Sequence, residues 1–409
     1  MTRKGMGPVR VLIVDHVGGI ETNRQKYAIL GSDPDVDLTL FVPETWIENQ
    51  RTVRAERDAE NCRVLTGRAG FRGYENRGFF YTGLAGAIAR TKPDVLHLNE
   101  EPFSLFALQS VLLARLIRPD VKILFYTFDN LRAGFRYPYR PSWFYGLVQR
   151  IVQGSSDLGT AGCADAMGIL RSRGFRKPAR FVPLGVDTSR FRKKDVSKGR
   201  AELGLGPFVI GFVGRLVPVK GVHVLLEALP RVEADWSCLV IGDGEQRGSV
   251  EDFVRTRGYA DRLRIEPGVP HGSVADWLNL MDVLVLPSIT MPNSKEQFGR
   301  VLIEAMACEV PVIGSDSGSI PEVIGEAGLV FPEGDSEALG RILSGLARDG
   351  AERARLAAAG RSRVTRHFSW RRVAETYKNI YDELLRGTPR SEDRPEWSTS
   401  SSSSPPSSP

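Results

Sequence analysis

Short runs of β-branched and apolar residues alternate with segments of helical apolar spacing along almost the whole chain. This alternation is typical of βαβ units, whose strands form parallel sheets. A first series of strands is predicted near Arg10–Val14, Asp37–Val42, Val95–Leu98, Lys122–Thr127, Asp157–Thr160 and Arg180–Val182. A second series is predicted near Phe208–Val213, Cys238–Ile241, Leu263–Ile265, Val283–Leu286, Val310–Ile313 and Leu329–Phe331. Two α/β domains in succession are therefore expected.

Changes in composition indicate where these domains begin and end. The first domain is expected over 1–190 and the second over 207–368, because a segment rich in Lys, Arg and Gly, 191–206, separates them as a linker. A helix is predicted over 369–386 from an apolar stripe comprising Val373, Tyr377, Ile380, Tyr381 and Leu384. The segment 387–409 is rich in Ser, Pro and charge, so it is predicted to be disordered.

The composition narrows the classes of partner and compartment. The net charge of +6 favours small anionic partners, whereas the absence of a dense Lys/Arg cluster argues against nucleic acid. The four cysteines are too scattered for a zinc site or a disulfide framework. The first apolar run, Val9–Val14, is too short and interrupted for a signal peptide or membrane span. A cytoplasmic protein is therefore expected, with contact to a membrane surface left open.

The first chemical motif is the loop that follows the strand Phe208–Val213. Arg215 and Lys220 stand at its two ends, and a helix is expected to begin near Val222. Ligands of open α/β sheets bind beyond the carboxyl ends of the strands. Two cations beside a helix N-terminus suit a diphosphate. The alternative is a solvated loop with two surface cations.

The second motif is a pair of glutamates, Glu296 and Glu304, around the start of a predicted helix. Their spacing corresponds to on the order of 10 Å along a helix, about the reach from a ribose to a sugar across a diphosphate. Carboxylates bind vicinal hydroxyls through two acceptor oxygens. The backbone amides of Phe298 and Gly299, near the helix start, could bind phosphate. The alternative is an amphipathic helix in which Glu304 pairs with Arg300.

In combination and order, these motifs resemble retaining glycosyltransferase family 4, the glycosyl transferases group 1. The matching segments are Gly214-Arg215, Lys220-Gly221, Glu296-Gln-Phe-Gly299, Glu304-Ala-Met-Ala307, Pro183-Leu-Gly-Val-Asp187, Ile241-Gly-Asp-Gly244, Ser317–Glu322 and Phe368-Ser-Trp370. The resemblance covers roughly Val9 to Leu385. It implies the GT-B fold, with two Rossmann-like domains facing each other across a cleft and the C-terminal helix packing back on the first domain.

The resemblance also implies roles for individual residues. Arg215 and Lys220 would bind the donor diphosphate, Glu304 the ribose, and Glu296 the donor sugar near the reacting carbon. His97 would face the donor sugar, although a core histidine is the alternative. Further donor contacts are expected from Gly18, Gly19, Val269 and Asp243. The acceptor-side candidates are Asp129, Asn99 and Glu101; Asp129 falls where many relatives carry a His-Asp or His-Glu pair.

The implied function is retaining transfer of a hexose-type sugar from a nucleotide-diphosphate sugar to a hydroxyl of a glycan, glycolipid or small molecule. Polysaccharide biosynthesis is the family's usual setting. Retention in this family is thought to proceed by same-face attack, so no enzyme nucleophile, metal or cofactor is expected. Asp33-Pro-Asp-Val-Asp37 mimics a metal signature but is expected to be a turn. The rival functions are a nucleotide-sugar epimerase, a phosphorylase, an oxidoreductase and a catalytically silent sugar-binding partner.

An aromatic and basic segment, Leu131–Ile151, allows two interpretations. Its aromatic residues could pack into the first domain. Alternatively, together with its arginines, they could rest on the inner face of a membrane or grip a lipid-linked acceptor. The residues concerned are Phe135, Arg136, Tyr137, Tyr139, Arg140, Trp143, Phe144, Tyr145 and Arg150.

Overall fold

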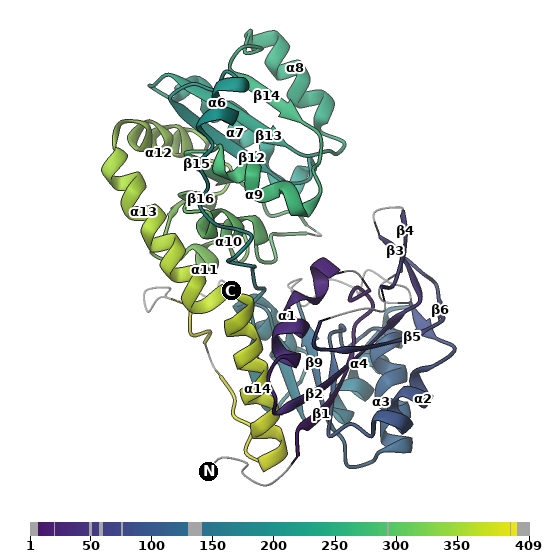
Figure 1. Ribbon diagram of the computed structural model, residues 1–409. Helices are drawn as coiled ribbons and strands as arrows, with labels where there is room; N and C mark the ends of the chain where they lie inside the picture. The colour runs from purple at the N-terminus through teal and green to yellow at the C-terminus, as the bar shows by residue number, and fades with distance from the viewer. Residues whose placement is uncertain are drawn as a thin grey trace. The chain divides into compact units, whose positions relative to one another are not determined.

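The computed structural model describes residues 7–19, 21–48, 51–56, 60–74, 77–129, 141–292, 294–392 and 394–398 (Figure 1). The chain forms two compact units. Unit 1 comprises Met1–Pro183 and Trp370–Pro395, and unit 2 comprises Leu184–Ser369 and Glu396–Pro409. The chain therefore leaves unit 1, forms unit 2 and returns. Within the described residues, no helix is both long enough and apolar enough to span a bilayer.

Unit 1 is built on a parallel sheet with the strand order β11-β10-β9-β8-β1-β2-β5. These strands are β1 (Val9–Val14), β2 (Val36–Pro43), β5 (Arg63–Gly67), β8 (Val95–Leu98), β9 (Lys122–Thr127), β10 (Leu158–Ala161) and β11 (Ala179–Phe181). Its helices are α1 (Glu21–Gly31), α2 (Leu84–Thr91), α3 (Leu105–Ile117), α4 (Ser142–Ser155), α5 (Ala164–Ser172) and α14 (Trp370–Arg386). The order reverses at β1, between β2 and β8.

Two antiparallel hairpins decorate this sheet. The first pairs β3 (Thr45–Glu48) with β4 (Arg51–Arg54), and the second pairs β6 (Ala69–Gly70) with β7 (Phe79–Phe80). Both follow the carboxyl end of a sheet strand, the first after β2 and the second after β5. The sequence pattern did not predict either hairpin or β5.

Unit 2 repeats the same plan, with the strand order β14-β13-β12-β15-β16-β17. The strands are β12 (Phe208–Val213), β13 (Trp236–Ile241), β14 (Leu263–Glu266), β15 (Val283–Leu286), β16 (Val312–Ser315) and β17 (Leu329–Phe331). Numbered along the unit, this is the Rossmann order 3-2-1-4-5-6, which reverses between β12 and β15. Ligands of such sheets bind at the carboxyl ends of these two strands.

Helices and short turns connect these strands. The α-helices are α6 (Ser197–Glu202), α7 (Val222–Ala228), α8 (Arg247–Arg257), α9 (Val274–Asn279), α10 (Arg300–Ala307), α11 (Ile320–Ile324), α12 (Ser336–Arg348) and α13 (Gly350–Arg363). The 3-10 turns are η1 (Pro218–Lys220), η2 (Leu229–Arg231) and η3 (His271–Ser273), and a π-helical turn is η4 (Val364–Phe368). A core cluster buried between the sheet and helices α7, α8 and α12 holds this unit together.

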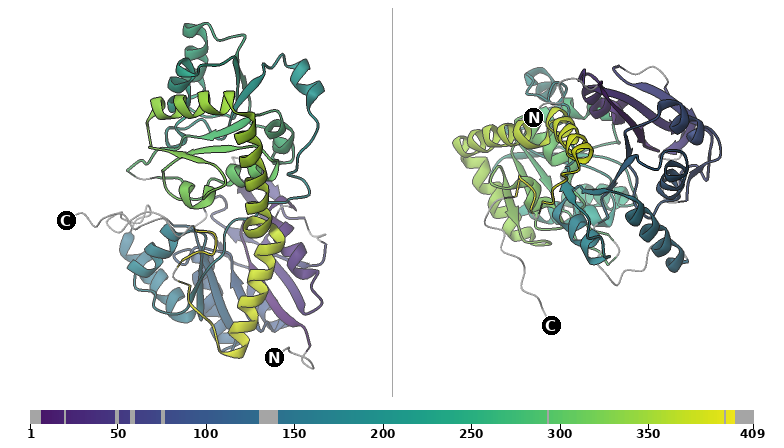
Figure 2. Two further views of the ribbon diagram at one scale, coloured as in Figure 1. Left: turned by 90° about the vertical axis from the view of Figure 1, so that its left-hand side faces the viewer. Right: turned by 90° about the horizontal axis from the view of Figure 1, so that it is seen from below.

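Helix α14 packs on unit 1, which confirms the predicted return of the C-terminal helix to the first domain. Its apolar stripe, read from the sequence, is buried with residues of β1, β2, β8, β9 and β10 in one core cluster. The helix lies beside α1 (Figure 1) and covers one face of the sheet (Figure 2). Alternate residues of each strand point to this face, and most of those residues are apolar.

Part of the segment 387–409, which was predicted to be disordered, makes specific contacts with the folded units. The Glu392 carboxylate accepts hydrogen bonds from the Arg180 side chain (2.6 Å) and the Phe181 backbone (2.9 Å). Trp397 is buried and its indole donates to Glu322 at 2.8 Å. These specific contacts offset the low apolar content on which the prediction of disorder was based. The chain passes from unit 1 to unit 2 between Pro183 and Leu184, whereas the sequence analysis placed the linker at 191–206.

His97 lies in the core beneath α14, which corrects its predicted place at a sugar site. Its side chain is fully buried, its Nδ1 lies 2.7 Å from the Tyr381 hydroxyl, and its ring packs on Tyr377. Because successive side chains of a strand point to opposite faces of the sheet, His97 points to the same face as Val95, and α14 covers that face. Burial lowers the pKa of His97 to about 3, with Lys26 acting in the same direction.

The buried imidazole predicts an acid-sensitive fold. The unfolded chain takes up a proton at His97 near pH 6.5, whereas the folded chain does so only near pH 3. Stability is therefore lost as pH falls below 6.5, by about 2 kcal/mol between pH 6.5 and 5 from this group. Urea unfolding of His97→Gln should show a correspondingly shallower pH dependence. His223→Gln, which removes an exposed histidine, should leave the dependence unchanged; equal slopes for all three proteins would contradict the assignment.

Candidate functional site

The site is built on the loops that follow β12 and β15, where the strand order of unit 2 reverses. The two loops are joined by a hydrogen bond from the Ile289 amide to the Val219 carbonyl, at 2.9 Å. Gly221 permits this approach. Its φ is 64°, and a Cβ there would lie 1.9 Å from the Pro287 carbonyl oxygen. A side chain at this position would separate the loops.

Lys220 and Glu296 meet at this junction. The Lys220 Nζ lies 2.5 Å from a Glu296 carboxylate oxygen, and the Ser288 hydroxyl donates to the same oxygen at 2.9 Å. The Glu296 side chain is 8% exposed and that of Lys220 is 20% exposed. The carboxylate is thus nearly removed from water and stabilised by one ammonium and one hydroxyl. Sequence reasoning singled out both charged residues but missed Ser288.

The loop that carries Glu296 also contacts the loop after β16. Gly318, in the loop after β16, has φ 56°, and a Cβ there would lie 2.0 Å from the Glu296 carbonyl oxygen. The Ser319 amide donates to that carbonyl at 3.3 Å. The loops after β12, β15 and β16 therefore fix the Glu296 backbone together.

Glu304 forms a second charged group on the first turns of α10. Its carboxylate oxygen lies 2.8 Å from the His271 Nε2 and 3.2 Å from the Arg300 Nε. The contact with Arg300 is the one that the structural alternative predicted. The sequence analysis did not identify His271, because no sequence signal joined it to a glutamate 33 residues away. Phe298, just before the helix, turns its ring into the core against Phe368, so only its backbone is available to a ligand.

Arg215, Asp243 and Val269 lie on three linked loops at the same sheet edge. Arg215 is exposed. The adjoining Leu216 amide donates to the Asp243 carbonyl at 2.9 Å, and the Asp243 carboxylate accepts from the Gly268 amide at 2.7 Å. Asp243 also pairs with Arg247 at 3.0 Å. Asp243 therefore organises the loop of Val269. The edge as a whole combines two cations of the loop after β12, Arg215 and Lys220, with two buried carboxylates.

Unit 1 carries a corresponding group of residues at the carboxyl ends of β1 and β8. Gly18 and Gly19 form the turn after β1, which is anchored by Asp15. The Asp15 carboxylate accepts from the Tyr27 hydroxyl at 2.6 Å, and the Arg24 guanidinium donates to the Gly19 carbonyl at 3.1 Å. The turn is therefore tied to α1 at two points.

His16 and Glu100 form a pair that the sequence analysis missed. The His16 Nδ1 lies 2.8 Å from a Glu100 carboxylate oxygen, and the ring stacks on Phe106. Burial raises the pKa of the Glu100 carboxyl, although His16 beside it acts in the opposite direction. The available signal was positional, since each residue follows a predicted strand directly. Sequence spacing could not show the pairing, because 84 residues separate the two.

Among the described residues, Asp15, His16 and Glu100 form a group whose ligand atoms lie within 4.8 Å of one another, as a metal site would require. Their oxygens and ring nitrogen already take part in the hydrogen bonds with Tyr27, Val17 and one another. We therefore describe the group as a hydrogen-bonded network.

The acceptor-side candidates occupy the same edge. Asn99 accepts from the Lys26 ammonium at 3.2 Å. The Glu101 carboxylate accepts from the Thr127 hydroxyl and the Phe128 amide, both at 2.7 Å. Burial raises the pKa of Glu101 to about 7. Asp129 pairs with Arg173 at 2.6 Å. These residues come from the ends of β8 and β9, so the sheet brings them together as a polar cluster.

Comparison with known proteins identifies relatives over part of the chain. Residues 194–363 match the model of glycosyl transferases group 1. The phosphatidyl-myo-inositol mannosyltransferase of Mycobacterium leprae is 31% identical over 305 residues, which cover 71% of this chain and 74% of that protein. The D-inositol 3-phosphate glycosyltransferase of Segniliparus rotundus is 35% identical over 219 residues, 50% of this chain. The match spans 47% of that protein, so the chain spans about half the length of this curated relative.

Solved structures extend the likeness to the fold. A glycosyltransferase from Rickettsia africae superposes with a TM-score of 0.71 at 18% identity and covers 93% of this chain and 100% of its own. Sucrose-phosphate synthase from Thermosynechococcus elongatus superposes with a TM-score of 0.67 at 21% identity, with the same coverage of both chains. The predicted GT-B class of two Rossmann-like domains is therefore confirmed.

The Lys220–Glu296 pair predicts that the two cations of the loop after β12 contribute differently to stability. Lys220→Ala leaves Glu296 without its ammonium and should lower the free energy of unfolding by about 1–3 kcal/mol. Arg215→Ala removes an exposed side chain and should change it by less than about 0.5 kcal/mol. Chemical denaturation of the ligand-free proteins measures both. An unchanged midpoint for Lys220→Ala would show that the pair is not formed in solution.

Proposed function

The chain belongs to the glycosyl transferases group 1, or glycosyltransferase family 4, and from this premise we propose that it is a retaining, metal-independent glycosyltransferase. It would transfer a hexose-type sugar from a nucleotide-diphosphate sugar to a hydroxyl group. The donor domain would comprise 207–368 and the acceptor domain 1–190. The proposal rests on one observation above all: Lys220 and Glu296 meet at the reversal of strand order in unit 2.

The charges at this edge suit the leaving group. Departure of a nucleoside diphosphate from an anomeric carbon adds negative charge to the diphosphate and leaves an oxocarbenium-like sugar. In our proposal Lys220 and the exposed Arg215 bind the diphosphate and stabilise that added charge. Because these cations would already be in position before the reaction, no water would have to reorganise around the leaving group.

The carboxylates would bind hydroxyl groups. Glu296, positioned by Ser288, would accept from hydroxyls of the donor sugar, and Glu304, oriented by His271 and Arg300, would accept from the ribose. Because Glu296 already accepts from Ser288 and Lys220, we assign it a binding role and not that of a nucleophile. The departing phosphate would then take the proton of the acceptor hydroxyl on the same face of the sugar.

The acceptor would bind at the polar edge of unit 1. Asn99, Glu101 and Asp129 would supply hydrogen-bond-accepting oxygens there. The His16–Glu100 pair at the same edge would face the donor sugar, the role that the resemblance implied for His97. The names of the relatives describe transfer to inositol 3-phosphate and to phosphatidylinositol and its mannosides. We propose a related polyol, glycan or glycolipid as the acceptor.

Thermal shift with nucleotides tests the donor site. The melting temperature should rise with one of UDP, GDP or ADP and its sugar, since a ligand that binds only the folded state stabilises it. The rise should be lost in Lys220→Ala and retained in Arg341→Ala, an exposed arginine on α12. Transfer should fall at least about a hundredfold in Glu296→Gln. An active Lys220→Ala/Glu296→Gln double variant would refute the site.

We also propose a peripheral contact with anionic lipid, through the outer faces of α3 and α4. The two helices pack side by side. Leu112 and Leu116 on α3 are 53% and 79% exposed, and Trp143 and Leu147 on α4 are 70% and 46% exposed. Helix α3 is thus apolar on its outer as well as its inner face, which is unusual for a surface helix.

The charges around these helices favour an anionic partner. Residues 102–119 and 130–156 contain no Asp or Glu, and Arg118 and Arg150 flank the apolar side chains. A second copy of the chain would place like charges opposite one another, whereas anionic lipid headgroups would neutralise them. Of the segment 131–151 predicted from the sequence, 131–140, with Phe135, Arg136, Tyr137, Tyr139 and Arg140, lies outside the described residues. Tyr145 is buried.

Vesicle sedimentation tests the lipid contact. The protein should bind vesicles that contain phosphatidylglycerol more strongly than vesicles of phosphatidylcholine alone, and less strongly as salt increases. Leu116→Ser/Trp143→Ser should weaken this binding by at least about tenfold, because the burial of two large apolar side chains is lost. Val330→Ser, an exposed position of unit 2, is the control. Equal binding by both variants would contradict the proposed surface.

A further inference from the structure

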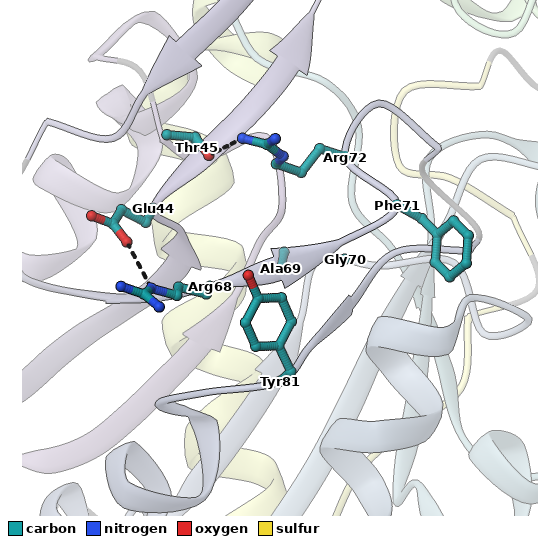
Figure 3. Close-up of a pocket in the computed structure, with 8 residues that line it drawn as sticks. All are labelled: Glu44, Thr45, Arg68, Ala69, Gly70, Phe71, Arg72 and Tyr81. Carbon is teal, nitrogen blue, oxygen red and sulfur yellow. Dashed lines mark hydrogen bonds and ion pairs between the residues drawn. The ribbon is translucent and has the colours of Figure 1, made fainter.

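Unit 1 contains a hollow that has no assigned role, between the end of β2 and the β6–β7 hairpin (Figure 3). Its volume is about 440 Å³, within the range of small-molecule sites. It is lined by Glu44, Thr45, Arg68, Ala69, Gly70, Phe71, Arg72 and Tyr81. It is therefore large enough for a substituted sugar ring or polyol.

The hairpin presents its polar side chains from a fixed backbone. Ala69 and Gly70 pair with Phe80 and Phe79, and the Tyr81 amide donates to the Arg68 carbonyl at 3.0 Å. The Arg68 amide in turn donates to the Thr82 hydroxyl at 3.0 Å. Arg68 and Tyr81 are thus set side by side on neighbouring strands, and the hydroxyl of Tyr81 points into the hollow (Figure 3).

The hollow carries an excess of positive charge. It is lined by two guanidinium groups, those of Arg68 and Arg72, and by one carboxylate, that of Glu44 (Figure 3). The Arg68 Nε lies 3.9 Å from Glu44, too far for a hydrogen bond, and its side chain is 68% exposed. Arg72 is oriented by a 2.8 Å hydrogen bond to the Thr45 hydroxyl. One arginine is thus positioned and the other is bound weakly enough to turn toward a ligand.

Two large aromatic side chains at the hollow are exposed to water. Phe71 and Tyr81 are each 60% exposed. Phe71 also adopts φ 50°, a left-handed conformation that costs a non-glycine residue about 1 kcal/mol or more. Because the ring of Phe71 is exposed in the free protein, its burial does not offset this cost. A ligand that covers the aromatic faces would offset it.

The hollow is connected to the turn of Gly18 and Gly19 through the β3–β4 hairpin. The Ala55 amide donates to the Glu44 carbonyl at 3.0 Å, and the Glu56 amide donates to the Gly19 carbonyl at 3.1 Å. Both hydrogen bonds lie within unit 1. The hollow is therefore tied to the turn after β1, at the carboxyl edge of the same sheet that carries the acceptor-side candidates.

We propose that this hollow binds an anionic group, a phosphate or carboxylate, carried by the acceptor. The inference rests on the proposed glycosyl transfer and adds that the acceptor is charged. Arg68 and Arg72 donate to the anion, because a guanidinium presents paired N–H groups that match the oxygens of either group. Phe71 and Tyr81 cover the adjoining ring or chain. The hollow thus selects an acceptor by charge at a distance from the reacting hydroxyl.

Calorimetric titration of the full chain with glucose 6-phosphate, glucuronate and glucose tests this assignment. These probes share a ring and differ in carrying a phosphate, a carboxylate or no charge. The wild type should bind glucose 6-phosphate or glucuronate at least about tenfold more tightly than glucose, and the two anions reveal which group is preferred. Arg68→Ala/Arg72→Ala should lose this preference, and Arg90→Ala, an exposed arginine on α2, should keep it.

Two results would overturn the proposal: equal binding of anionic and neutral probes by the wild type, or an undiminished preference in the double variant. Nucleotide-induced thermal shift separates this outcome from failure of the proposed function. Arg68→Ala/Arg72→Ala should retain the shift, because its changes lie in unit 1, and this also shows that the variant is folded. Loss of anion binding with an intact nucleotide response then concerns the hollow alone. A wild type that binds the anionic probes but shows no nucleotide response refutes the donor site and leaves the hollow standing.

Discussion

The candidate donor site depends on keeping one carboxylate, that of Glu296, almost out of water. A carboxylate in such a place needs a cation and hydrogen-bond donors, and Lys220 and Ser288 supply them. The pair forms only because Gly221 and Gly318 let three loops approach closely. The same ammonium is the group best suited to bind a diphosphate. Binding of an anion must therefore redistribute the Lys220 interaction, so the ligand competes with the bond that organises the empty site.

Both units have the same strand order, but the side chains at the place where that order reverses differ in chemistry. In unit 2 the edge combines lysine and arginine side chains with glutamates, which suits an anion flanked by hydroxyls. In unit 1 the corresponding edge is dominated by buried carboxylates, including Glu100 and Glu101, whose pKa values burial raises. Such groups accept hydrogen bonds from hydroxyls and do not attract phosphate. At that edge Lys26 and Arg173 are engaged by Asn99 and Asp129, whereas the hollow adds the guanidinium groups of Arg68 and Arg72.

The sequence predicted the repeated α/β plan well, because parallel strands buried on both faces have a strong apolar signal. β5 was missed because Arg63–Gly67 is an edge strand with exposed polar residues. The candidate donor-site residues were found because their motifs occur in the combination and order of the family. His97 was misplaced because proximity to a strand end does not reveal which face a side chain takes. The pairs His16–Glu100 and His271–Glu304 could not be inferred, since only the folded sheet brings their loops together.

The return of α14 has a consequence for how the chain folds as it is synthesised. Unit 2 is encoded by one nearly continuous stretch, so it can complete its core soon after that stretch leaves the ribosome. Unit 1 cannot, because Tyr377 and Tyr381, which cover His97, are made only after residues 184–369 of unit 2. Until then one face of its sheet is exposed to water. Unit 1 thus completes its core only after the main stretch of unit 2 has been made, and a nascent chain stalled before α14 would present an apolar surface that chaperones bind.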